Sequence, residues 1–317
     1  TEPPEVTAQH REVVAFLVSA IGDLPPREAR LLRGVFFEGR FKQRGWCVRR
    51  TGCTGRGVWT SVAAWLVMAS STAAIAAERN IVFFVTDDES PTLGCYGDAV
   101  AVSPAADALA ADGTLFTHAY ATTASCSASR SVLLSGLHNH ATGQYGHQHD
   151  FHKFAAWYDL VGLSLPRALA RSGYRTARIG KYHVAPEEVF HFDESIPGNT
   201  RNAMAMAEAS KAFLTADDER PFFLYFATSD PHRGGGVDQT SDLDLKPDLF
   251  GNKPERGSHP GVDETFFDPA EVTVPPWLPD TPETRSELAQ YYQSCSRIDQ
   301  GLARLVAILK EAGLYEK

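Results

Sequence analysis

Short, continuous apolar runs alternate along this chain with stretches whose apolar residues keep a helical spacing. The runs are typical of parallel strands that are buried on both faces, and the run at 81–85 is the clearest. Strands are expected at 81–85, 115–121, 175–179 and 222–227, and helices at 13–41, 103–113, 125–136, 164–171, 202–214 and 283–313. This alternation predicts an α/β fold with a mostly parallel central sheet and helices on both faces.

The first 76 residues do not follow that alternation. Three arginines between 49 and 56 precede a mainly apolar run at 58–69, and Ala74-Ile75-Ala76 follows. Basic, apolar and small residues in that order indicate a secretory signal peptide, and the run is shorter than the roughly 20 residues of a membrane span. We expect export to the periplasm or the extracellular space, or to the lysosome in an animal. The predicted parts are a non-functional upstream segment at 1–48, the signal peptide at 49–76 and a catalytic domain at 77–317.

Charge and cysteine content narrow the possible classes of function. The formal charge is -9, and residues 77–317 carry 20 Lys and Arg against 33 Asp and Glu. A body this acidic argues against nucleic-acid binding. It still allows an anionic substrate, because screening over about 8 Å lets a local cationic pocket dominate at contact range. The five cysteines are too few and too irregularly spaced for a disulfide scaffold or a zinc ribbon.

The strongest local signal is a cysteine at the head of the helix predicted at 125–136. Ser125 or Ser127 can cap this helix, and a glycine stands at its end. The helix dipole and the Arg130 guanidinium one turn away both favour a thiolate or another anionic group at Cys126. A buried structural cysteine is the alternative. A tyrosine-phosphatase loop is excluded, because it needs a longer spacing between its cysteine and its arginine.

Four polar clusters each follow a predicted strand. They are Asp87-Asp88, the Cys126 loop, Lys181 with His183, and Asp230 with His232. Ligands of parallel sheets bind outside the carboxyl ends of the strands, so these clusters are expected to meet in one site. Two adjacent carboxylates repel each other, and calcium or magnesium, which prefer oxygen ligands, would relieve that repulsion. Taken singly, the acids also fit helix caps, the histidines fit satisfied loop residues, and the lysine fits the surface.

A group of histidines surrounds Asp150. No regular ligand spacing appears among them, which favours hydrogen bonding to a polar substrate, or packing, over metal binding. They are His138, His140, His147, His149 and His152.

From residue 80 to residue 317 the chain resembles the N-terminal part of a sulfatase of the alkaline-phosphatase superfamily. Cys126-Ser127-Ala128-Ser129-Arg130 matches the signature Cys-x-Pro/Ala-x-Arg, with alanine where proline is commoner. The similarity extends to 87–88, 93–97, 145–154, 179–184 and 230–233. Within the family it is strongest to the branch that removes the N-sulfate of glucosamine in heparan-type glycans.

This resemblance implies a set of roles. Cys126 is oxidised to formylglycine by a formylglycine-generating enzyme and, with Asp87 and Asp88, binds one calcium ion. Arg130 holds the side of the site that carries the formylglycine and the metal, and His183 orients the nucleophile. The sulfate is contacted by Lys181, His232 and Arg233, and His232 is the proton donor to the leaving group.

The implied activity is hydrolysis of sulfate from a sulfated glycan. An O-sulfatase, a phosphonate or phosphodiester hydrolase, and an inactive calcium- or glycan-binding protein are the alternatives. The family's second metal pair and its small C-terminal domain lie beyond Lys317, so a truncated catalytic domain is expected. No nucleic-acid partner and no stable membrane span are expected, and a homodimer is left open.

Overall fold

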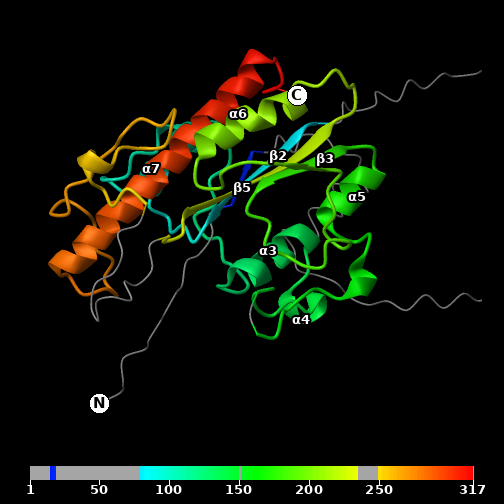
Figure 1. Ribbon diagram of the computed structural model, residues 1–317, viewed down its shortest axis with the longest axis horizontal. Coiled ribbons are helices and arrows are strands. Elements are labelled where there is room, and N and C mark those ends of the chain that lie inside the picture. Colours follow the sequence, from blue (N-terminus) through cyan, green and yellow to red (C-terminus); the bar gives the residue numbers. More distant parts are fainter. Residues whose placement is uncertain (1–14, 19–78, 150, 235–248, 317) are drawn as a thin grey trace, which may run out of the picture. The chain divides into compact units, whose positions relative to one another are not determined.

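The computed structural model describes residues 15–18, 79–149, 151–234 and 249–316, with only the backbone described for 15–18. The centre is a five-stranded sheet in the order β1-β2-β5-β3-β4 (Figure 1). Its strands are β1 Ala15–Val18, β2 Ile81–Asp87, β3 Arg175–Gly180, β4 Glu194–Ile196 and β5 Phe222–Pro231. All neighbours pair in parallel except β1, which joins β2 in antiparallel fashion. The predicted α/β fold with a mostly parallel sheet is confirmed.

Helices cover both faces of this sheet, because its strands are apolar on both sides (Figure 1). Val82 and Phe84 of β2 pack in the core under α2, α6 and α7, whereas Phe83 and Val85 face the core under α3 and α5. The α-helices are α2 Pro104–Asp112, α3 Cys126–Ser135, α4 Asn139–Thr142, α5 Leu165–Arg171, α6 Ala203–Leu214 and α7 Pro282–Glu311. The short 3₁₀ helices are η2 Gly94–Tyr96, η3 Tyr158–Leu160 and η4 Pro254–Arg256.

The longest helix, α7, is specified by its ends and by its apolar stripe. Thr281 caps it by accepting a hydrogen bond from the Thr284 amide, and Pro282 occupies its first turn. Apolar residues at helical spacing, such as Ile298, Leu302 and Leu305, are buried against the sheet side. This helix therefore covers one face of the sheet and reaches the edge where β5 ends.

Two sequence-based expectations are wrong. Residues 115–121 form no strand, since no neighbouring strand pairs with them and Phe116 and Tyr120 lie exposed on an irregular segment. Residues 15–18, placed in a helix by the sequence pattern, form β1. The predicted signal peptide at 49–76 and the rest of the predicted upstream segment lie outside the described residues.

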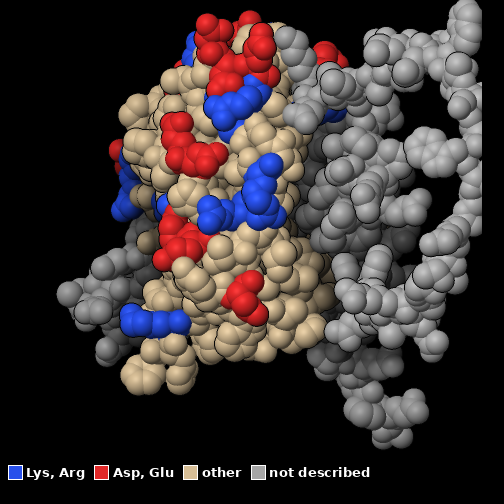
Figure 2. Space-filling view, turned by 90° about the vertical axis from the view of Figure 1, so that its right-hand side faces the viewer, with Lys and Arg blue, Asp and Glu red and all other residues tan. Residues whose placement is uncertain are grey.

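No helix among the described residues is both long and apolar enough to span a membrane. On the face shown in Figure 2, basic and acidic side chains of the described residues are interspersed.

Candidate active site

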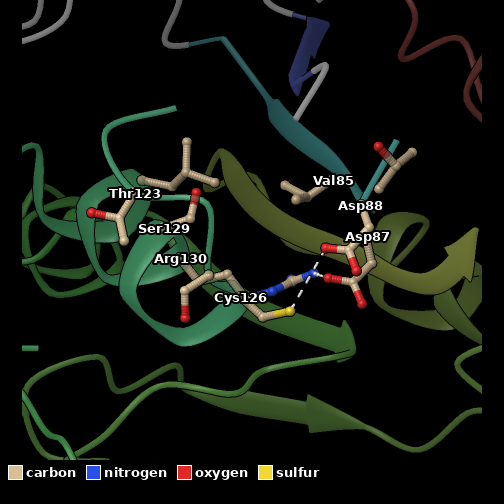
Figure 3. Close-up of a pocket in the computed structure, with 10 residues that line it drawn as sticks. Val85, Asp87, Asp88, Thr123, Cys126, Ser129 and Arg130 are labelled. Atoms are coloured by element: carbon tan, nitrogen blue, oxygen red, sulfur yellow. Dashed lines mark hydrogen bonds and ion pairs between the residues drawn. The ribbon is translucent and has the colours of Figure 1, made fainter. Parts of the chain in front are cut away.

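Three neighbouring strands end at the same edge of the sheet and deliver three of the four polar clusters there. β2 ends in Asp87, which is in register with Pro231 of β5, and Gly180 of β3 is in register with Ala227 of β5. The fourth cluster arrives at the N-terminus of α3, whose N-cap is Ser125. Figure 3 shows Asp87, Asp88, Cys126 and Arg130 converging on one pocket.

Asp87 is the buried centre of the site. One carboxylate oxygen lies 3.0 Å from Arg130 Nη2, and the other accepts a hydrogen bond from Lys181 Nζ. Burial alone would raise the pKa of Asp87, but the nearby positive charges of Arg130 and Lys181 outweigh it, so that the pKa lies below its usual value. Asp87 is therefore an anion clamped between two cations.

Arg130 links three neighbouring strands, β2, β3 and β5, through hydrogen bonds. Its Nη1 donates to the main-chain oxygen of Lys181 at 3.0 Å and to the Tyr225 hydroxyl at 2.9 Å, while Nη2 binds Asp87. The side chain is buried, so these bonds compensate a charge that would otherwise be costly to desolvate. The sequence pattern did not identify Tyr225, because it lies inside the apolar run of β5.

The surroundings of Cys126 disfavour the thiolate that its place at the helix N-terminus and near Arg130 would favour. Its Sγ lies 3.5 Å from Lys181 Nζ and 3.8 Å from Asp88 Oδ1. Burial, and then the negative charge of Asp87, raise the pKa of the Cys126 thiol to about 11, against the opposite effect of Lys181. The guanidinium expected to stabilise a thiolate is instead paired with Asp87.

The backbone at the strand ends is held in an uncommon conformation. Asp88 and His183 have φ values of 59° and 56°, in the left-handed region that non-glycine residues seldom adopt. Gly180 precedes Lys181 and approaches β5 so closely that a Cβ would lie 2.0 Å from the Ala227 oxygen. The left-handed backbone of Asp88 and His183 costs about 1–3 kcal/mol per residue, and strain of this kind is characteristic of functional sites.

Three histidines stack beside the cysteine. The ring centroids of His147, His149 and His183 lie 4.8–5.2 Å apart, and His149 Nδ1 is 2.7 Å from His183 Nε2. Burial, followed by the positive charge of Lys181, lowers the pKa of His183 to about 4, so this imidazole is neutral at physiological pH. The sequence pattern predicted that His183 lies in one site with Cys126. For His147 and His149 it favoured hydrogen bonding to a polar substrate, or packing, and did not predict their position beside Cys126.

An ion-pair network centred on the buried Asp230 holds the C-terminal end of β5 and the turn that follows it. Asp230 binds Arg201 Nη1 at 2.9 Å through one oxygen and Arg297 Nη2 at 2.9 Å through the other. Arg201 also donates to the main-chain oxygen of His232 at 2.8 Å. His232 in turn directs Nε2 toward Asp88, 3.6 Å away, while its Nδ1 lies 2.9 Å from the Arg233 oxygen.

Asp230→Asn is expected to lower the free energy of unfolding by about 3–5 kcal/mol, because it leaves the buried Arg297 guanidinium without a compensating charge. Urea denaturation measures this change. Asp280→Asn is the matched control, since Asp280 is exposed and pairs with Arg285 at the surface, so the change should be far smaller. Equal stability of the Asp230 variant and the wild type would contradict a structural role for the network.

The structure brings together Asp87, Asp88, Cys126, Arg130, Lys181, His183 and His232. Arg233, expected to contact substrate, forms an ion pair with Glu287 of α7 at 2.6 Å. Ligand atoms of Asp87, Asp88, Cys126 and His232 lie within 4.8 Å of one another. The two carboxylates suit calcium, although calcium takes about 6–8 oxygen ligands and this group supplies only part of them.

Comparison with known proteins gives a consistent result. A family model described as Sulfatase matches residues 79–317. The human N-sulphoglucosamine sulphohydrolase is 38% identical over 245 residues, covering 74% of this chain and 48% of that protein. The chain thus spans about half the length of this curated relative.

Two solved structures share the fold. The protein yidJ of Bacteroides fragilis gives a TM-score of 0.54 at 18% identity, covering 75% of this chain and 59% of that one. A protein solved in complex with its substrate D-glucosamine-2-N,6-O-disulfate gives 0.51 at 18% identity, covering 75% and 63%.

Proposed function

Since the chain belongs to the sulfatase family, we propose that it hydrolyses sulfate from a sulfated sugar, namely the N-sulfate of glucosamine in heparan-type glycans. The observation that carries this proposal is the position of Cys126 at the N-terminus of α3, within reach of Lys181 and Asp88. The choice of an N-sulfate rests on the 38% identity to the human N-sulphoglucosamine sulphohydrolase.

We further propose that a formylglycine-generating enzyme oxidises Cys126 to formylglycine, and that Asp87 and Asp88 hold one calcium ion. When present, these groups supply a hydrated aldehyde, with one hydroxyl to attack sulfur and a second whose deprotonation expels sulfate, and a cation that offsets the charge of the sulfuryl oxygens. The residues fit these groups, because the carboxylates are hard donors and Cys126 lies beside both Asp88 and Lys181.

The chain's own residues provide the remaining chemistry. Lys181 Nζ lies between Asp87 and Cys126, where it can donate to sulfuryl oxygens as negative charge develops. Neutral His183 can orient a hydroxyl at position 126. His232 lies with Nε2 on the Asp88 side, so in its protonated form it can give that proton to the departing amine. Arg130 holds Asp87 in place.

An O-sulfatase is the second candidate function. The fold neighbour solved with D-glucosamine-2-N,6-O-disulfate has a substrate that carries both an N-sulfate and an O-sulfate. The proposed centre around Cys126 suits either sulfate, and the pocket around the sugar decides between them. We also propose that the protein is exported, on the evidence of the signal-peptide pattern at 49–76.

The test begins with the protein isolated from its native source. Mass spectrometry of the Cys126 peptide is expected to show the aldehyde, and the protein is expected to release sulfate from N-sulfoglucosamine. Chelation should stop the release, and added calcium should restore it. Release from 6-O-sulfated glucosamine alone would favour the O-sulfatase, whereas an unmodified thiol without any release would overturn the enzymatic proposal and favour a binding protein.

A further inference from the structure

Cys126 has a second set of neighbours, distinct from the carboxylates. Ligand atoms of Cys126, His147 and His183 all lie within 4.8 Å of one another. His147 belongs to the loop after α4, and His183 to the loop after β3, so the group is assembled from three separate segments. One sulfur and two imidazole nitrogens are the donors preferred by zinc rather than by calcium.

The bonding of His183 is that of a histidine prepared to bind a metal. Its Nε2 is 2.7 Å from His149 Nδ1, whereas its buried Nδ1 has no hydrogen-bond partner among the described residues. With the proton of the neutral ring on Nε2 and donated to His149, a lone pair remains on Nδ1. Metal-ligating histidines characteristically give their other ring N–H to a carboxylate, a main-chain oxygen or water, and here the acceptor is the Nδ1 of a second histidine.

His147 contacts the two serines that flank Cys126, and its ring stacks on those of His149 and His183. Its Nε2 and Nδ1 each lie 3.5 Å from a serine hydroxyl, those of Ser125 and Ser127. Hydrogen bonds of this length are weak and cost little to break. Donor atoms around a tetrahedral zinc ion are separated by about 3.6 Å, given Zn–S of about 2.3 Å and Zn–N of about 2.0–2.1 Å. The donor atoms must therefore close by about 1 Å. Because the His147 and His183 rings stack at an interplanar angle of 13°, at least one ring must also rotate to direct its nitrogen at the shared ion.

We propose that, while residue 126 is a cysteine thiol, Cys126, His147 and His183 bind one zinc ion, with His149 as a positioning residue. The thiol loses its proton as the sulfur–zinc bond forms, and a water molecule fills the fourth position. The formylglycine form, which rests on the proposed function, lacks the sulfur and does not bind zinc. The chemical state of residue 126 therefore decides whether the zinc site exists.

The test uses the whole chain with an unmodified Cys126, verified by mass spectrometry, and cobalt(II) as a spectroscopic substitute for zinc. We expect a thiolate-to-cobalt charge-transfer band that zinc abolishes by displacement. The band should be lost in Cys126→Ser, and both band and tight binding should be lost in His147→Ala and His183→Ala. His149→Ala should bind about 10–100-fold more weakly. His140→Ala is the matched control, because His140 is exposed on α4, and its titration should be unchanged.

Other outcomes overturn the proposal. A band that survives Cys126→Ser places the metal at another cysteine. A band lost in His232→Ala but kept in His147→Ala places it with Asp87 and Asp88. Thermal unfolding without metal identifies any variant that fails to fold, and His147→Asn or His183→Asn then replaces it. No turnover is measured, so failure of zinc binding and failure of the proposed sulfatase activity are independent results.

Discussion

Cys126→Ser is expected to lower steady-state sulfate release roughly a millionfold, the scale of loss when a covalent nucleophile is removed. A serine keeps a hydroxyl at the N-terminus of α3, near Lys181 and Asp88. One hydroxyl can attack sulfur, but no second hydroxyl is left whose deprotonation would expel the sulfate. The variant should therefore form at most one equivalent of free amine. Rapid-mixing kinetics measure this equivalent, and mass spectrometry of the variant should find one sulfo group on the peptide that contains position 126.

The matched control is Cys95→Ser. Cys95 is a half-buried free cysteine in η2, and its amide binds Asp107 away from the site. This variant should retain steady turnover. Repeated turnover by Cys126→Ser would show that residue 126 does not act through a covalent intermediate, and the proposed chemistry would be wrong.

The fold was predictable for those segments whose local pattern of apolar residues matches their burial in the folded structure. The apolar runs that form β2 and β5 are buried on both faces, so each is recognisable without knowledge of its neighbours. Residues 115–121 have local strand preference but no pairing partner, and their aromatic residues Phe116 and Tyr120 stay exposed. A strand depends on the backbone of another segment, which is information that a local pattern lacks. For the same reason the short strand β4 was not predicted.

The site was predictable through one topological rule. Asp87, Lys181 and His232 follow strands of a parallel sheet, and the carboxyl ends of such strands meet at one edge. Partners from other elements were not predictable. His147 has no regular ligand spacing, and Tyr225 reads as part of an apolar strand, yet both reach the site through tertiary structure.

The charge state of Cys126 shows the same limit. Local features, a helix N-terminus and an arginine one turn away, predict a thiolate. In the structure Arg130 is committed to Asp87, and burial together with that carboxylate raises the pKa of the thiol to about 11. The ion pair between Arg130 and Asp87 therefore leaves less positive charge to stabilise a thiolate at Cys126. The contacts that stabilise the site therefore make the thiol less reactive. This supports the proposed oxidation of Cys126 to formylglycine.

His232→Ala is expected to reduce kcat by about 10²–10⁴-fold for N-sulfoglucosamine, the range for loss of a general acid. An aryl sulfate should lose much less, because a phenolate departs without a proton. Arg201→Leu should reproduce this pattern with a smaller loss, since Arg201 holds the main-chain oxygen of His232 at 2.8 Å. His191→Ala, at a half-buried histidine beside Glu187, is the control and should leave both rates unchanged. Steady-state kinetics with both substrates decide the matter: equal losses for the two would mean that His232 binds sulfate without donating a proton, because binding does not distinguish leaving groups.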